Sequence, residues 1–292
     1  MNSASDMRSG KGSSDENFPV ASWLVAPRHR RLILTFYDFA RAADDVGDHP
    51  TLDAATKLAM LGQMERTLQG QDDTEPAALP LRLALAERGL SPRHGLDLLV
   101  AFKRDCTKNR YDDWAELMDY CRYSANPVGR FVLDVHGESE ELWPVNDALC
   151  SALQIINHLQ DCAEDYREID RVYVPRDALA AEGLDVSALA AAQATPALRH
   201  CLSQLALRTD HLLDVSEAFA GRIRDSRLAC EVAVIQRLAR RLVGLLRDRD
   251  PLSERVHLSK SQMAATALGG VLDITVQRLF RPDRSLAGRI TS

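Results

Sequence analysis

The stretch NHLQDCAEDYREIDRVYVP, residues 157–175, decides the fold prediction for this chain. Asp161 and Asp165 lie four residues apart in it. Asn157 lies four residues before Asp161, and Gln154 lies three residues before Asn157. Positions separated by three or four residues stack along one face of an α-helix. The spacing therefore predicts a helix that carries a line of polar side chains.

A second acidic cluster with the same spacing lies far upstream, in ARAADDVGD, residues 40–48. Asp44 and Asp48 are four residues apart at the predicted end of a helix. Like charges on adjacent turns repel, and the helix dipole disfavours acid at a C-terminal end. The cluster therefore needs a positive partner. One such pair is typical of a solvated helix face, but two pairs predict clusters that face each other across a helical pocket.

Magnesium is the cation that such clusters suit best. Mg²⁺ takes oxygen ligands, usually one or two carboxylates together with substrate phosphates. We expect Asp44, Asp48, Asp161 and Asp165 to bind metal ions that bridge to a diphosphate. The metal ions would neutralise the leaving group and lower the barrier to C–O ionisation.

Neighbouring side chains fit a diphosphate site. Arg41 lies three residues before Asp44, and Arg171 follows the second cluster, so both are predicted to contact diphosphate oxygens. Gln154 and Asn157 are predicted to contact substrate or metal-bound water.

Aromatic and basic residues complete the candidate set. Tyr37 and Tyr173 would offer an aromatic face or a hydroxyl to a developing carbocation. A basic run is predicted to be a solvated face, with a second phosphate clamp as the alternative; it consists of Lys103, Arg104, Lys108 and Arg110.

Composition favours a helical protein. The chain has 292 residues, of which 46% are hydrophobic, and β-branched and aromatic residues are scarce. The net charge of −6 argues against general nucleic-acid binding. No strand-like alternation, Gly-rich phosphate loop or dinucleotide fingerprint is evident.

The apolar periodicity predicts one all-α domain over residues 17–285, preceded by a disordered tail over residues 1–16. Pro127 is predicted to break the helical pattern, and Gly129 to permit a close approach. The predicted helices cover residues 28–48, 53–69, 81–88, 91–103, 114–121, 130–136, 145–166, 175–182, 195–220, 224–247 and 259–280.

The chain is predicted to be cytoplasmic. It carries six cysteines without a CxxC pair, which indicates reduced thiols. No signal peptide is evident. The uncharged stretch over residues 261–272 is too short to span a bilayer.

The two clusters resemble the motifs of the squalene/phytoene synthase family. The first motif is similar to residues 37–48, and the second to residues 154–175 with their terminal RVYVP. A third element resembles Tyr120 and Cys121 followed by residues 125–129. The resemblance implies an all-α isoprenoid synthase bundle with a central active-site cavity, Mg²⁺ as cofactor and a prenyl diphosphate substrate.

Within the family, residues 16–22, 107–111 and 120–130 most resemble the hydroxysqualene synthase branch of bacterial hopanoid pathways. Asn126 and Pro127 replace a glycine that condensing members usually carry. The branch implies that presqualene diphosphate ionises, rearranges and is captured by water, without a hydride donor. It also implies functional coupling to other hopanoid-pathway enzymes, and a lipid product would suit peripheral contact at the inner membrane face.

Two alternatives remain open. The first is head-to-head condensation of two prenyl diphosphates to presqualene diphosphate, squalene or phytoene. The second is a non-catalytic helical partner of such enzymes, against which the four intact aspartates argue.

Overall fold

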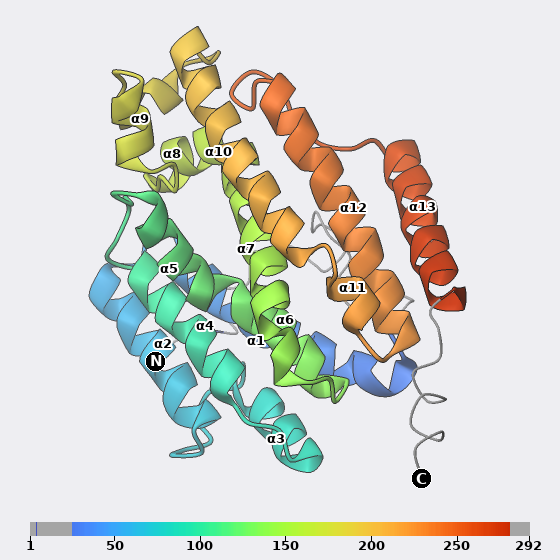
Figure 1. Cartoon of the computed structure of the whole chain (residues 1–292). Helices are drawn as coiled ribbons and strands as arrows, with labels where there is room; N and C mark the ends of the chain where they lie inside the picture. Colours follow the sequence, from blue (N-terminus) through green and yellow to red (C-terminus); the bar gives the residue numbers. More distant parts are fainter. Residues whose placement is uncertain (1–3, 5–24, 281–292) are drawn as a thin grey trace.

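The computed structural model describes residue 4 and residues 25–280, and over these residues the chain is helical with no named strand (Figure 1). The all-α prediction is confirmed. The predicted tail, the start of the domain at residue 17 and its end at residue 285 lie outside the described residues. The helices are α1 (Pro27–Gly47), α2 (Ala54–Leu68), α3 (Leu79–Arg88), α4 (Arg93–Asp105), α5 (Trp114–Ser124), α6 (Asn126–Val135), α7 (Trp143–Gln160), α8 (Cys162–Ile169), α9 (Arg176–Ala181), α10 (Pro196–Ser216), α11 (Phe219–Arg222), α12 (Ser226–Asp248) and α13 (Lys260–Leu279), with short 3₁₀ turns η2 (Glu140–Leu142) and η3 (Val186–Ala190).

Side-chain caps fix where several helices begin. The capping side chains each accept a backbone N–H of the first turn, which satisfies a donor that has no partner inside the helix. They belong to Asp53, Asp113, Thr195, Asp225 and Ser259.

The start of α4 differs from the prediction. The sequence predicts a helix over residues 91–103, but the helix begins at Arg93. The Ser91 hydroxyl accepts the backbone N–H of Arg93 at 3.2 Å. A serine that bonds two residues ahead forms a local turn instead of a cap, so the helix starts later.

The predicted single helix over residues 145–166 is wrong. The chain bends at Asp161, where φ is −101° and ψ is 7°, and α7 and α8 lie on either side. Asp161 N still donates to Asn157 O at 2.9 Å, and Asp165 N donates to Asp161 O at 2.8 Å. Apolar periodicity reports which face is buried and does not detect a bend at a single residue. A similar break separates α10 from α11 within the range predicted as one helix.

The predicted break near Pro127 is confirmed. α5 ends at Ser124, and Ala125 has a φ of −122° and a ψ of −48°. Pro127 then lies in the first turn of α6, where its missing N–H costs no helical hydrogen bond.

Two clusters of buried apolar side chains make up the core. One gathers mainly α1–α4 and includes Phe36 and Phe131. The other gathers mainly α5, α7, α10 and α12 and includes Leu149 and Val232. Helix α6 contributes to both, since Phe131 belongs to the first cluster and Leu133 to the second. Helix α6 therefore lies on the boundary between the two clusters.

Helix α13 packs on α12 through its smallest residues (Figure 1). A Cβ atom at Gly270 would lie 3.0 Å from Val234 Cα, so the two backbones approach closely there. Ile274 of α13 is also buried, whereas other large apolar side chains of the helix point to solvent; Leu268 and Leu272 are 63% and 56% exposed. Within the described part of the chain, no helix is both long and apolar enough to cross a membrane.

All six cysteines lie in the described residues and are free thiols. Cys121, Cys162 and Cys201 are buried, and the other three are half-buried. The predicted absence of disulfides among them agrees with this arrangement.

Candidate active site

The first acidic cluster sits at the C-terminal end of α1 and has the positive partners that the sequence required. Arg41 Nη1 lies 2.9 Å from Asp44 Oδ2, and Arg41 Nη2 lies 3.1 Å from Asp45 Oδ1. These are the i, i+3 and i, i+4 neighbours on one helix face. Asp48, the C-cap residue, pairs with an arginine from a distant segment: Arg171 Nη1 lies 2.7 Å from its Oδ1.

Arg171 is the residue at which the two motifs meet. Its side chain is 7% exposed. Besides Asp48, it donates from Nη1 to the Tyr173 hydroxyl at 3.4 Å and from Nη2 to the Asp105 carbonyl at 3.3 Å. The prediction that the two clusters face each other is therefore supported by a direct ion pair between them.

The backbone around Arg171 is held in place by a loop from the middle of the chain. Asp170 adopts a left-handed conformation with a φ of 51°, which turns the chain sharply after α8. Val172 N then donates to Asn109 O at 2.9 Å, and Arg176 N donates to Tyr111 O at 3.0 Å. These backbone hydrogen bonds hold the RVYVP segment against the loop that joins α4 to α5.

The second acidic cluster is close enough to the first for their charges to interact. Burial and the neighbouring Asp161 raise the pKa of Asp165 to about 8, Arg171 opposes this shift, and Asp48 adds to it. Burial and Asp48 likewise raise the pKa of Asp44 to about 7, against the opposing effect of Arg41. Both carboxyl groups thus lie in surroundings that disfavour their charged form, first through burial and then through neighbouring acids.

The predicted four-aspartate metal set is not assembled as a complete metal centre. Among the described residues, no three His, Cys, Asp or Glu side chains converge in a way that would hold an ion. Asp44 and Asp48 point to arginines instead. Because substrate phosphates supply many ligands to Mg²⁺, the metal assignment stays a prediction.

Tyr173 belongs to a buried network that the sequence did not predict. Its hydroxyl lies 3.2 Å from that of Tyr120, which donates to Asp105 Oδ2 at 2.7 Å. Burial raises the pKa of Asp105 to about 7, with Arg171 as the main opposing charge. Asp105 lies four residues after Ala101 and seven after the buried Leu98. An acid on the apolar face of α4 was the available signal.

His158 and Gln154 lie on the other side of this network. The His158 ring stacks on Tyr173 with 3.5 Å between ring centroids, and Gln154 Nε2 lies 3.2 Å from His158 Nε2. Burial lowers the pKa of His158 to about 3, and Arg171 lowers it further. Asn157 lies one turn before the bend at Asp161.

The basic run on α4 and the following loop is a paired surface. Each of its four cations has a carboxylate partner, so the alternative of a second phosphate clamp is not favoured. The pairs are Lys103 with Glu65, Arg104 with Asp119, Lys108 with Glu116 and Arg110 with Asp170.

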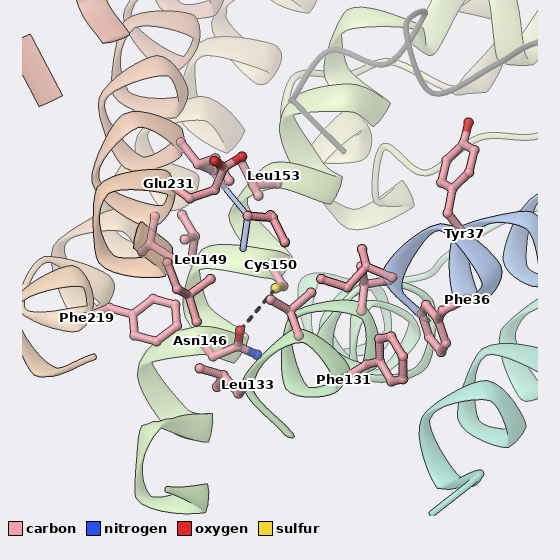
Figure 2. A pocket seen from close by; sticks show the side chains of 18 of the residues that line it. Phe36, Tyr37, Phe131, Leu133, Asn146, Leu149, Cys150, Leu153, Phe219 and Glu231 are labelled. Carbon is pink, nitrogen blue, oxygen red and sulfur yellow. Dashed lines mark hydrogen bonds between the residues drawn. The ribbon is translucent and has the colours of Figure 1, made fainter. Parts of the chain in front are cut away.

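An apolar cavity of about 270 Å³ lies between α1, α6, α7, α11 and α12 (Figure 2). It occupies the boundary between the two apolar clusters, with Phe36 on one side and Leu149 on the other. Of the predicted site residues, Tyr37 lines it. Arg41 lies one turn further along α1, and Gln154 directly follows the lining residue Leu153. The cavity and the first cluster thus use successive turns of α1, and the second cluster follows the C-terminal end of α7.

Gly129 brings the backbone of α6 against α7 in the cavity wall, as predicted. A Cβ atom there would lie 2.1 Å from Asn146 Oδ1 and 2.5 Å from Cys150 Sγ. Both distances are shorter than a Cβ contact allows, so any side chain here would displace Asn146, Cys150 or the helix itself. Val128 beside it also lines the cavity.

Sequence comparisons agree with this architecture. A model of the squalene/phytoene synthase family matches residues 12–262. A hydroxysqualene synthase of Rhodopseudomonas palustris is 55% identical over 280 residues, 96% of each chain. A hydroxysqualene synthase of Zymomonas mobilis is 52% identical over 266 residues, 90% of each chain. This chain belongs to the squalene/phytoene synthase family.

Solved structures of family members have the same fold. Squalene synthase HpnC from Alicyclobacillus acidocaldarius is 30% identical, covers 94% of this chain and 92% of its own, and has a TM-score of 0.65. A dehydrosqualene synthase in complex with ligand has a TM-score of 0.79 at 19% identity, over 94% of this chain and 96% of its own, which bears on the fold alone. The predicted resemblance to the family and to its hydroxysqualene synthase branch is confirmed.

Proposed function

We propose that this chain is a hydroxysqualene synthase, which converts presqualene diphosphate and water to hydroxysqualene and diphosphate. One observation carries the proposal: an apolar cavity lies one turn of α1 away from the first aspartate cluster, and Arg171 of the second motif pairs with Asp48 of that cluster. A substrate with a charged diphosphate head and a long hydrocarbon body fits a site with one charged part and one apolar part. The relatives named hydroxysqualene synthase, which cover nearly the whole chain, support the choice of reaction.

The donor set suits Mg²⁺. All four candidate ligands are carboxylates, and burial together with neighbouring acids raises the pKa values of Asp44 and Asp165, an effect that a divalent cation would oppose. In this proposal Asp44, Asp48, Asp161 and Asp165 hold the metal. When bound, the metal supplies charge neutralisation for the departing diphosphate.

The arginines orient the diphosphate by charge-assisted hydrogen bonds. Arg41 and Arg171 already lie among the aspartates, and their guanidinium groups would exchange carboxylate partners for diphosphate oxygens. Gln154 and Asn157 extend the polar line of α7 toward the cavity and would contact substrate. The ring of Tyr37, which lines the cavity, would face the developing carbocation, because an aromatic face attracts positive charge. The Tyr173 hydroxyl, which accepts from Arg171, would help to hold the diphosphate.

The Asn126 and Pro127 departure supports the water-capturing branch. Asn126 is 6% exposed, and its Oδ1 accepts the Ser151 hydroxyl at 3.0 Å, which ties the start of α6 to α7. The segment that follows includes Val128 and Gly129 in the cavity wall. A change at the start of α6 therefore acts on the part of the site that surrounds the hydrocarbon.

The test is product identity. The purified protein, incubated with presqualene diphosphate and Mg²⁺ but no NADPH, is expected to yield hydroxysqualene, measured by mass spectrometry. A parallel reaction contains farnesyl diphosphate alone. If presqualene diphosphate is inert and two farnesyl diphosphates are joined, the chain is a head-to-head condensing enzyme instead. If neither substrate reacts, the alternative of a non-catalytic helical partner is favoured.

We also propose a cytoplasmic location, with one all-α domain over residues 17–285 and functional coupling to other hopanoid-pathway enzymes. Peripheral membrane contact is proposed through the outer face of α13. Leu272, Val276 and Leu279 are 56%, 51% and 75% exposed along that face. The sequence after Phe280 adds three arginines and one aspartate. An apolar helix face beside net positive charge suits an anionic lipid surface.

Membrane contact is tested by sedimentation with anionic phospholipid vesicles. The double substitution Leu272→Gln and Leu279→Gln is expected to lower vesicle binding by about tenfold, since it removes two apolar side chains from the bilayer. Leu83→Gln is the matched control, because Leu83 is 57% exposed on α3. Equal binding by both variants would remove the support for α13.

A further inference from the structure

Of the described residues that line the cavity, Glu231 alone has a charged side chain. It lies on α12 and is 5% exposed. The other lining residues are almost all aliphatic or aromatic, and Figure 2 shows the Glu231 carboxyl among them. Among the described lining residues, Glu231 is thus the one that presents a carboxyl group to a molecule in the cavity.

The polar atoms of α7 in the same cavity are engaged with each other and with the helix. Asn146 Oδ1 accepts the Cys150 thiol at 3.7 Å, and Asn146 Nδ2 donates to Asp147 Oδ1 at 3.2 Å. Neither group is a base strong enough to take a proton from water that attacks a cation. The carboxyl of Glu231 is the cavity group with that chemistry.

We infer that Glu231 governs the fate of the carbocation, by holding the attacking water and accepting its proton. This inference rests on the proposed function. After diphosphate has left, a water lone pair forms the new C–O bond to the allylic cation. One O–H bond of that water breaks, and its proton passes to the Glu231 carboxylate. The products are neutral hydroxysqualene and a protonated Glu231, which returns its proton to solvent when the product leaves.

The same carboxylate has a second effect before capture. Its negative charge lies in a wall of low polarity, where an electrostatic attraction to the cation is stronger than in water. It therefore favours positions of the cation near the water. The aspartates and arginines at the other end of α7 act earlier, on the diphosphate. Ionisation and capture thus depend on different residues.

The experiment separates these two steps in Glu231→Gln with presqualene diphosphate and Mg²⁺. Diphosphate release reports ionisation, and the ratio of hydroxysqualene to hydrocarbon products reports capture. We expect diphosphate release to stay within about threefold of wild type, and the hydroxysqualene fraction to fall by about tenfold or more as the cation loses a proton instead. Circular dichroism checks that the variant is folded.

Two variants make the result decisive. Glu87→Gln removes a carboxylate from the exposed end of α3 and is expected to change neither quantity. Glu231→Asp keeps the charge but withdraws it from the cavity, and it decides the question if Glu231→Gln does not fold. We expect an intermediate hydroxysqualene fraction from it.

Three outcomes are distinguishable. An unchanged product ratio in the folded Glu231 variants overturns the inference. An equal fall of diphosphate release and of hydroxysqualene also overturns it, because a merely structural role would lower both. If the wild-type protein releases no diphosphate from presqualene diphosphate, the proposed function fails, and the inference fails with it.

Discussion

Where α1 ends and α7 passes into α8 the site is made of aspartates and arginines, and a few turns back along α1 and α7 it is made of aromatic and aliphatic side chains. The charged end is held together by ion pairs between distant segments, such as Arg171 with Asp48. The apolar end is held together by close packing, such as Gly129 against Asn146. Removing a charge should therefore alter chemistry at the first end, and adding volume should alter shape at the second.

The largest effect is expected from Asp161→Asn at the charged end. Loss of this carboxylate should lower the rate of diphosphate release by about 10³-fold, because it would remove a ligand of the Mg²⁺ that neutralises the leaving group. The free energy of unfolding should not fall, since Asp161 and Asp165 are like charges that raise the pKa of Asp165. Steady-state kinetics and urea denaturation measure the two quantities. A variant with normal activity would contradict the role of Asp161.

A large effect on stability is expected from Arg171→Ala. This change leaves Asp105, which is 6% exposed, without its nearest cation. Breaking such a buried pair should lower the free energy of unfolding by about 3 kcal/mol. Urea denaturation measures the loss.

Arg176→Ala is the matched control, five residues further along the chain. Arg176 pairs with Asp112 at 3.2 Å, but both side chains are more than half exposed. Its loss should cost less than about 1 kcal/mol. Equal destabilisation by both substitutions would show that Arg171 is not a central link between the two motifs.

The charged end was largely predictable from the sequence. Acids four residues apart repel each other, so their recurrence beside Arg41 and Arg171 indicated a shared cation or anion. The bend at Asp161 was not predictable, because the apolar periodicity continues across it. The backbone hydrogen bonds on both sides of the bend also keep the helical i, i+4 pattern. Asp105 was missed because it directly follows Lys103 and Arg104, and an acid beside basic residues is typical of the exposed face of a helix.

The apolar end was less visible. Its lining residues look like ordinary core positions, since a cavity wall and a packed core have the same periodicity. Glu231 lies within a long apolar helix pattern, and one acid there is indistinguishable from a surface residue until the tertiary fold is known. Only Gly129, next to the helix break, gave a local signal of close approach. The sequence thus predicts clusters of charged residues better than it predicts cavities.

A moderate effect is expected from Gly129→Ala at the apolar end. The added methyl group would overlap Asn146 and Cys150, so α6 must move away from α7 in the cavity wall. We expect the free energy of unfolding to fall by about 1–3 kcal/mol. The KM for presqualene diphosphate should also rise, because the cavity changes shape.

Gly244→Ala tests whether this effect comes from the cavity wall. Gly244 lies inside α12 with nothing within 4 Å of an added Cβ atom. Alanine there should leave KM unchanged and raise stability by up to about 1 kcal/mol. If both alanine variants behave alike, the close contact at Gly129 does not shape the cavity.

The last effect concerns pH and His158, a buried histidine on α7 next to Tyr173, and it appears only when the pH is changed. Burial lowers the pKa of His158 from 6.5 to about 3, so the unfolded chain binds a proton between these pH values and the folded chain does not. Its contribution to stability is therefore complete above pH 6.5 and is lost as the pH falls toward 3. The slope from one such group is at most about 1.4 kcal/mol per pH unit.

In His158→Phe this contribution should disappear while the stack on Tyr173 is kept, so the free energy of unfolding should vary less between pH 6 and pH 4 than in wild type. His29, whose burial lowers its pKa to about 4, adds a slope of the same sign in both proteins and cancels in their difference. The exposed His211→Phe is the control for loss of a histidine. Urea denaturation across the pH range measures all three proteins. An unchanged slope in His158→Phe would mean that His158 is protonated in the folded state, and that water reaches its ring.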